Sequence, residues 1–107
     1  LLEDGGIAIG FLSFSLHYGD KNDRTRLHKL YLLPDQHGKG LGKMMLNFVL
    51  KHSENEGDKG LELNVNKKNP AFDFYLQQGF EVEKAVVLEI GNNYVMDDYV
   101  MVRSLNV

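Results

Sequence analysis

Apolar and polar residues alternate with a period of two along several stretches that are rich in aliphatic and aromatic residues. This alternation is typical of β-strands, because successive side chains of a strand point to opposite faces of the sheet. In the first long stretch the parity changes near Gly10, which predicts either a bulge or a strand buried on both faces. We place strands at residues 7–18, 24–33, 61–66, 80–90 and 94–105, after a strand end that precedes a Gly-Gly turn.

The stretch from residue 41 to residue 56 has a helical pattern instead. Its apolar residues stand at positions i, i+3, i+4, i+7 and i+8, so they form one stripe that we expect to face the core. The stripe consists of Leu41, Met44, Met45, Phe48 and Val49. Glycines that follow residue 56 are expected to end this helix.

A shorter helix is predicted to follow residue 69. Asn69 is a suitable N-cap, and Pro70 fits the first helical position because its missing N–H would have no helical partner there. We expect the inner face of this helix to consist of Ala71, Phe72, Tyr75 and Leu76. A glycine then stops the helix before the next strand.

The order of these elements predicts how the sheet is connected. A strand, a helix and a strand follow one another between residues 24 and 66, and such a unit is right-handed and parallel. Gly91-Asn92-Asn93 is a hairpin turn signal, so the last two strands are expected to pair antiparallel. The predicted fold class is α/β (α+β), with a mixed sheet flanked by helices.

A glycine-rich segment, Gly38-Lys39-Gly40-Leu41-Gly42, lies between a strand and the long helix. Alternating glycines let backbone N–H groups close around a ligand, and the positive end of a helix favours a phosphate. We therefore expect a pyrophosphate-bearing small molecule, with a tight turn that binds nothing as the alternative. The glycine spacing fits neither the GxxxxGK[ST] of a Walker loop nor the GxGxxG of a dinucleotide site.

Composition narrows the class of protein. The 107 residues suffice for one domain, and 12 basic against 15 acidic residues give a net charge of −3, which argues against nucleic acid as a partner. The sequence contains no cysteine and its four histidines show no HxxxH spacing, so we expect no metal site. No apolar run reaches about 18 residues and no signal-peptide pattern opens the chain, so we expect no membrane contact and a cytoplasmic location.

Two blocks of the sequence together resemble the GNAT acetyltransferases. The glycine-rich segment is similar to the pyrophosphate loop of that family, usually Q/R-x-x-G-x-G/A. Residues 69–80, NPAFDFYLQQGF, are similar to its second block, N-x-x-A-x-x-x-Y-x-x-x-G-F. The resemblance extends from residue 7 to the C-terminus. The two blocks together are more specific for this family than either block alone.

This resemblance implies that acetyl-CoA is bound as a co-substrate and that its acetyl group is transferred to an amine. It implies a central, largely antiparallel sheet in which the parallel strands around residues 27–33 and 61–66 splay apart and admit the pantetheine arm. The residues implied to bind acetyl-CoA are Leu30, Tyr31, Leu32, His37, Gly38, Lys39, Gly40, Leu41, Gly42, Lys43, Asn66 and Asn69. The first three would act through backbone N–H groups, with Leu32 as the best oxyanion donor and their side chains in the core.

The sequence departs from the family pattern at three places. His37 stands where the family usually has Gln or Arg, with Gln36 one place earlier. Lys68 holds the place of the family's asparagine, so either Asn66 or Asn69 is expected to reach the cofactor. Family members usually begin with a strand and two helices that are not found here, so we expect this N-terminal segment to be missing, because the chain is a fragment or because a partner supplies the cover.

Tyr75 matches the tyrosine of the family and is implied to be the general acid that protonates the departing thiolate of CoA. The alternative is a packing residue with a hydrogen-bonded hydroxyl. Tyrosine has a pKa near ~10 and a thiol near ~8.5, so this transfer needs a nearby dipole or positive group.

His28 is the first candidate for the base that takes the proton of the amine, with a chain of water molecules as the alternative. It shares strand parity with Leu30 and Leu32, and an imidazole is the side chain best suited to exchange a proton at neutral pH. Asp97 and Asp98 are adjacent on a predicted strand, so at most one of them can face the site.

The layout of the first strands is similar to that of polyamine acetyltransferases such as the spermidine/spermine enzymes, which implies a small-molecule amine as acceptor. A protein N-terminus or lysine is the alternative within this class. A regulatory module that binds acyl-CoA without catalysis is the alternative from another class. The last strand, YVMDDYVMVRSL, is apolar enough to form a sheet edge that pairs with another chain, which favours a homodimer.

Overall fold

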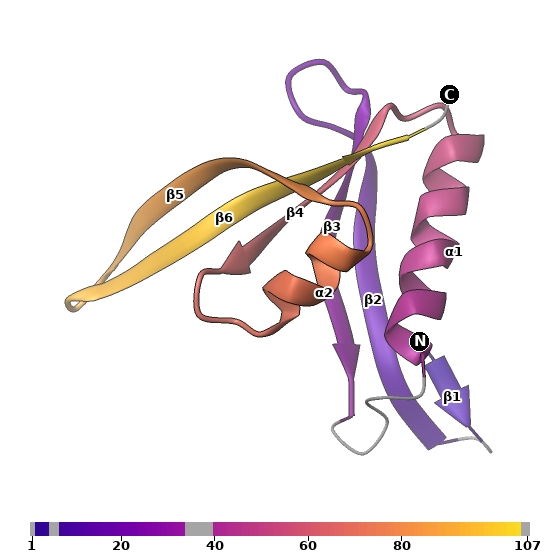
Figure 1. The fold of residues 1–107 in the computed structure, drawn as a ribbon, viewed down its shortest axis with the longest axis horizontal. Helices are drawn as coiled ribbons and strands as arrows, with labels where there is room; N and C mark the ends of the chain where they lie inside the picture. Colours follow the sequence, from indigo (N-terminus) through magenta and orange to yellow (C-terminus); the bar gives the residue numbers. More distant parts are fainter. Residues whose placement is uncertain (1, 5–6, 34–39, 106–107) are drawn as a thin grey trace.

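The computed structural model describes residues 2–4, 7–33 and 40–105. Its helices and strands lie close to the predicted ranges, and both predicted helices are present (Figure 1). In chain order the elements are β1 (Leu2–Asp4), β2 (Ile7–Tyr18), β3 (Arg24–Leu32), α1 (Leu41–Asn55), β4 (Gly60–Asn66), α2 (Ala71–Gln77), β5 (Glu81–Gly91) and β6 (Tyr94–Ser104).

The strands form one six-stranded sheet in the order β1-β2-β3-β4-β6-β5. Only β3 and β4 pair in parallel, so the prediction of a mixed, largely antiparallel sheet is confirmed. The prediction that the last strand forms an edge is wrong, because the β5–β6 hairpin folds so that β6 lies between β4 and β5. Strand β6 is therefore paired on both sides and cannot form a homodimer along a free edge.

The change of parity near Gly10 corresponds to a bulge in β2. Leu2 pairs with Gly10 and Glu3 pairs with Ala8, which leaves one extra residue on β2 between these pairs. Gly10 also lies against the neighbouring strand, because a Cβ atom added there would be 2.6 Å from the carbonyl oxygen of Tyr31. Only glycine fits at this position without moving the backbone of β3.

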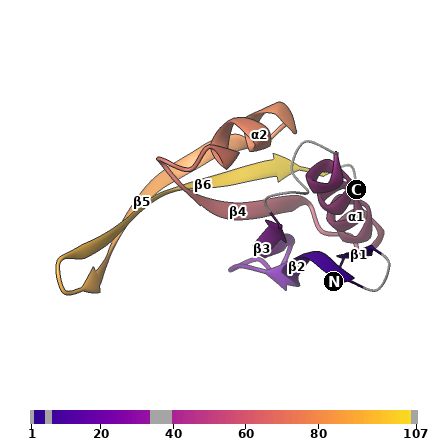
Figure 2. The ribbon, with the colours of Figure 1, turned by 90° about the horizontal axis from the view of Figure 1, so that it is seen from below.

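Both helices pack into one apolar cluster on one face of the sheet (Figure 2). The predicted stripe of α1 is only partly correct, since Met44 and Phe48 are 49% and 60% exposed. The buried face of α1 consists of Met45, Leu46, Val49, Leu50 and Ser53. Apolar side chains surround more than half of this helix, so periodicity alone did not show which part of the stripe contacts the sheet.

Helix α2 begins as predicted, because the Asn69 Oδ1 atom accepts a hydrogen bond of 2.9 Å from the N–H of Ala71. The inner face of α2 differs from the predicted one at one position. Leu76 is 44% exposed, and Phe74 packs against the core cluster instead. Phe74 also reaches towards the start of α1, where a Cβ atom added to Gly42 would lie 3.7 Å from its ring.

Strands β3 and β4 diverge after a short paired segment, as predicted. Their register pairs join Arg24 to Gly60, Thr25 to Leu61 and Arg26 to Glu62, and pairing ends there although both strands continue. Leu61, Leu63 and Val65 of β4 face the helices and are buried. The residues between them, Glu62 and Asn64, therefore lie on the other face of the sheet, which no helix of the described residues covers.

Candidate functional site

A cleft of about 330 Å³ opens where β3 and β4 diverge. Among the residues predicted to form the site, the structure brings five into the lining of this cleft. They are His28, Leu30, Tyr31, Asn69 and Tyr75. The cleft passes between the two strands, so it has one side towards α2 and another towards the open face of the sheet.

Tyr75 enters the cleft from α2. Its ring packs edge-on against the rings of Phe74 and Phe80, with centroid distances of 5.3 and 5.5 Å. Burial raises the pKa of the Tyr75 hydroxyl above its ordinary value of 10.0. The hydroxyl is therefore protonated at neutral pH and is available as a proton donor, although burial makes it a weaker acid than free tyrosine.

His28 lies at a bulge of β3, and the parity argument for it is wrong. Ser13 pairs with Lys29 while Phe14 pairs with Leu27, so His28 is an extra residue without a counterpart on β2. Its Nε2 atom shares a hydrogen bond of 2.8 Å with the Ser15 hydroxyl, whose direction depends on the tautomer. The imidazole is exposed and still lines the cleft, so it is accessible to a substrate there.

The three residues expected to offer backbone N–H groups differ in their surroundings. The side chain of Leu30 packs against the core cluster and that of Leu32 is buried, as expected. Tyr31 is not a core residue, because it is 46% exposed and its ring lies 5.4 Å from that of Phe11 on the open face. Leu30 and Tyr31 line the cleft, whereas Leu32 ends β3 outside its lining.

The two candidate asparagines both order the connection between β4 and α2. The Asn66 Oδ1 atom accepts a hydrogen bond from the N–H of Lys68, and Asn69 caps α2. Only Asn69 also lines the cleft. Asp97 and Asp98 do not line it, and the Asp97 carboxylate instead forms an ion pair of 2.7 Å with Lys67.

Helix α1 starts at a glycine in the left-handed conformation. Gly40 precedes the helix with a φ of 74°, and its carbonyl oxygen accepts a hydrogen bond from the N–H of Met44. The first turn, which contains Leu41, Gly42 and Lys43, has no acidic residue that would repel an anion. The remaining predicted loop residues, His37, Gly38 and Lys39, lie outside the described residues.

A pair of glycine substitutions tests this helix start. Gly40→Ala should lower the free energy of unfolding by about 1 kcal/mol, because the left-handed conformation costs a residue with a Cβ about that much. Gly42→Ala should be neutral or stabilising, since its Cβ would make ordinary contacts of 3.7 Å or more. Urea unfolding of both variants measures the difference, and equal effects would contradict the assignment of Gly40 to the left-handed position.

Two polar features of the folded protein were not predicted from the sequence. The Oδ1 atom of Asn64 is buried beside the cleft and has no hydrogen-bond partner among the described residues. Asp58, between α1 and β4, is fully buried and accepts hydrogen bonds from the side chain of Thr25 and the backbone of His17. Alternation along β4 places Asn64 on the face opposite to that of Leu63 and Val65, and only this pattern could have suggested the first feature.

The described part of the chain offers neither a metal cluster nor a membrane-spanning helix. Within residues 2–4, 7–33 and 40–105, no group of three His, Asp or Glu side chains could hold a metal ion. Neither of the described helices has the length and apolar character needed to cross a bilayer.

Comparison with known proteins agrees with this geometry. The family description "Acetyltransferase (GNAT) family" matches residues 1–80. An uncharacterized N-acetyltransferase of Mycobacterium tuberculosis is 39% identical over 88 residues, which are 81% of this chain and 55% of that protein. An uncharacterized N-acetyltransferase of Methanocaldococcus jannaschii is 30% identical over 89 residues, which are 79% of this chain and 39% of that protein. The chain thus spans about half the length of the curated relatives from Mycobacterium.

Solved structures show the same fold. The PaiA N-acetyltransferase of Thermoplasma acidophilum, in complex with coenzyme A, superposes with a TM-score of 0.75 at 25% identity and covers 95% of this chain and 57% of its own. The ribosomal-protein-S18-alanine N-acetyltransferase of Escherichia coli superposes with a TM-score of 0.80 at 20% identity. The match covers 98% of this chain and 66% of the Escherichia coli chain. With the family match over most of its length and the splayed strands at its centre, the chain belongs to the GNAT family of acetyltransferases.

Proposed function

We propose that this protein is an acetyl-CoA-dependent N-acetyltransferase that transfers the acetyl group directly to a primary amine of a small molecule. The observation that supports this most strongly is the cleft at the splayed strands. Its lining holds a protonated phenol, Tyr75, and an accessible imidazole, His28, which can serve as an acid and a base. Tyr75 belongs to α2 and His28 belongs to β3, so the acid and the base come from two sides of the cleft.

The cleft and the start of α1 fit acetyl-CoA. A cleft that passes between two strands suits a narrow pantetheine arm. The start of α1, where Gly42 faces Phe74 and Leu32, the neighbours in sequence of two lining residues, suits a pyrophosphate. Gly40, Leu41, Gly42 and Lys43 would hold the pyrophosphate end, with His37, Gly38 and Lys39 of the preceding loop. Leu30, Tyr31 and Asn69 would line the arm. When bound, acetyl-CoA supplies the acetyl group in activated form, as a thioester.

The residues of the cleft have distinct roles in the proposed reaction. His28 takes the proton of the incoming amine, which is charged at neutral pH and must lose that proton before it attacks. Backbone N–H groups at the end of β3 stabilise the negative charge that develops on the acetyl oxygen. Tyr75 gives its proton to the departing sulfur.

A protein N-terminus is the alternative acceptor within this class, because the Escherichia coli structure that shares this fold is named for an alanine of a ribosomal protein. The hypothesis of a polyamine acceptor is supported only by the layout of the first strands. A regulatory module that binds acyl-CoA remains the alternative from another class, and it would bind acetyl-CoA without acetylating any amine.

Titration calorimetry with acetyl-CoA tests the proposal first, with ATP and NAD as controls. We expect micromolar binding of acetyl-CoA and none of the two nucleotides, because the glycine loop fits neither nucleotide motif. A panel of primary amines would then be assayed for release of free CoA. Binding without turnover of any amine would favour the regulatory module, and the absence of binding by a folded protein would contradict the proposal.

A further inference from the structure

A second cleft of about 550 Å³ lies on the open face of the sheet, next to the first. It is lined by the β2–β3 turn and by residues of β3, β4, β5 and β6. Asn64 of β4 lines both clefts, so it marks the place where they meet. A molecule in the second cleft can therefore approach the splayed strands from the side opposite to α2.

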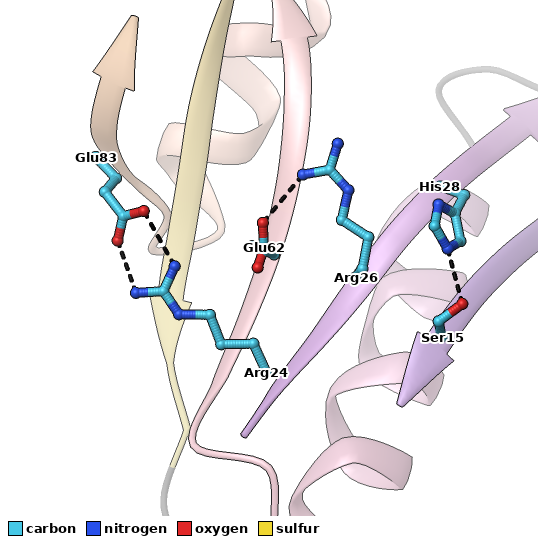
Figure 3. A network of polar contacts seen from close by, with 6 residues as sticks. All are labelled: Ser15, Arg24, Arg26, His28, Glu62 and Glu83. Carbon is cyan, nitrogen blue, oxygen red and sulfur yellow. Dashed lines mark hydrogen bonds and ion pairs between the residues drawn. The ribbon is translucent and has the colours of Figure 1, made fainter. Parts of the chain in front are cut away.

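The lining of this second cleft carries charges of both signs. Arg24 donates to both carboxylate oxygens of Glu83, at 3.0 and 2.7 Å, so both of its terminal nitrogens bind the same carboxylate (Figure 3). Arg26 is bound differently, because only its Nη1 atom donates to Glu62, at 3.1 Å. No other partner of the Arg26 guanidinium lies within the described part of the chain, so its second terminal nitrogen is available to donate to a ligand.

Asn64 supplies the complementary group. It is two residues beyond Glu62 on the same face of β4, roughly 7 Å along the strand. Its Oδ1 atom is buried and has no hydrogen-bond partner in the described residues. A buried acceptor without a donor is unfavourable, so a small rotation of the Asn64 side chain that turns this oxygen into the cleft would let an N–H group of a ligand satisfy it.

From this arrangement we infer that the acceptor is an α-amino carboxylate, that is, a free amino acid or a close analogue. The free nitrogen of Arg26 binds the carboxylate, and Glu62 and Asn64 Oδ1 bind the ammonium group. The amine then lies at the junction of the two clefts, where Asn64 lines both clefts and His28 lines the first. This inference rests on the proposed acetyl transfer and specifies its substrate class.

A polyamine fits this cleft less well. Of the two glutamates in the lining, Glu83 gives both carboxylate oxygens to Arg24, whereas Glu62 gives only one oxygen to Arg26. A ligand with several positive charges would have to compete with the Arg24 guanidinium for Glu83, and the other acidic residues of the lining, Asp20 and Asp23, are balanced by Lys21 and Lys84. A zwitterion instead presents a carboxylate to the arginine and an ammonium group to the acceptors, which leaves the local charge balanced.

Matched pairs of substrates test this inference with the protein as it exists. Each pair consists of an amino acid and the amine that remains when its carboxylate is removed, for example phenylalanine with phenethylamine, histidine with histamine, and lysine with cadaverine. We expect kcat/KM to be on the order of 10- to 100-fold higher for the amino acid of at least one pair, because hydrogen bonds to charged groups contribute about that much. Acetyl-CoA binding is measured in parallel.

Variants show whether Arg26 causes the preference. Arg26→Gln should reduce the ratio of kcat/KM within each pair towards one, mainly through KM of the amino acid. Arg26→Gln leaves Glu62 without its partner. The double variant Arg26→Gln/Glu62→Gln is therefore included, because it removes one positive and one negative charge and leaves the net charge of the cleft unchanged. Arg24→Gln is the matched control, since it removes an equal charge from the same cleft but from a guanidinium committed to Glu83.

The outcomes separate the inference from the proposed function. A preference that Arg26→Gln abolishes and Arg24→Gln retains supports the inference. Turnover of the amines that equals or exceeds turnover of the amino acids overturns it, while leaving acetyl transfer intact. Binding of acetyl-CoA without turnover of any member of the panel contradicts the inference together with the proposed small-molecule acetyl transfer.

Discussion

Asp58→Ala is expected to lower the free energy of unfolding by about 3 kcal/mol. Asp58 and Thr25 are both fully buried, and the Thr25 hydroxyl donates to Asp58 Oδ2 at 2.7 Å. The same carboxylate accepts from the backbone N–H of His17 at 3.0 Å, and its other oxygen lies 2.7 Å from His17 Nδ1. Alanine removes all of these bonds and leaves the Thr25 hydroxyl buried without a partner, which accounts for the size of the loss.

Urea unfolding measures this loss, and a double-mutant cycle with Thr25→Val identifies its origin. Removal of both partners should cost less than the sum of the single losses, because no buried hydroxyl is then left unsatisfied. A loss below about 1 kcal/mol for Asp58→Ala, or additive effects in the cycle, would contradict the assigned network.

The same carboxylate makes stability depend on pH. Burial disfavours its charge, but the hydrogen bonds from His17 and Thr25 outweigh burial and lower the pKa of Asp58 below its ordinary value of 3.8. The charged form is thus the stabilising one, and its contribution is complete above about pH 4 and is lost as pH falls through the lowered pKa. The stability difference between the native protein and Asp58→Asn should shrink as the pH is lowered from 5 to below 3, as thermal unfolding across this range would show.

Tyr75→Phe is expected to reduce kcat by about 10²- to 10⁴-fold, the usual contribution of a positioned general acid. The change removes only the hydroxyl, and the ring keeps its contacts with Phe74 and Phe80. The fold and the affinity for acetyl-CoA should therefore remain as they are. Steady-state release of CoA, with the best amine acceptor, gives the effect on kcat.

His52→Phe provides a matched control for this experiment. His52 lies on α1, and its ring contacts Phe14 and Phe48 rather than the cleft. If Tyr75→Phe retained turnover within a few-fold of the native rate, the general-acid role would be wrong and the tyrosine would be a packing residue.

Much of the fold was predictable from local patterns. The alternation at residues 61–66 and the helical spacing from Leu41 placed β4 and α1 almost to the residue. Gly91-Asn92-Asn93 placed the hairpin, and Asn69 and Pro70 placed the start of α2. These features depend on nearest neighbours along the chain, which a single sequence records directly.

The features that were missed depend on contacts between distant segments. Whether Phe48 or Leu46 faces the sheet depends on how α1 is rotated against β3 and β4, and apolar spacing permits both. The bulge at His28 depends on its pairing with β2, so parity along β3 alone gave the wrong face. For the candidate site, the residues on α2 and β3 were predicted through family resemblance, whereas Asn64 was recognisable only from its burial in the folded protein.

The strands of the sheet fall into two groups that meet at the short parallel segment between β3 and β4. One group contains β1, β2 and β3, the other contains β4, β5 and β6, and the described strands join them through only three register pairs. The apolar cluster to which both helices contribute and the bidentate contact from Arg24 to Glu83 on the open face both cross this boundary. A ligand bound where β3 and β4 diverge would touch both groups, so it would act as a further crosslink within the sheet.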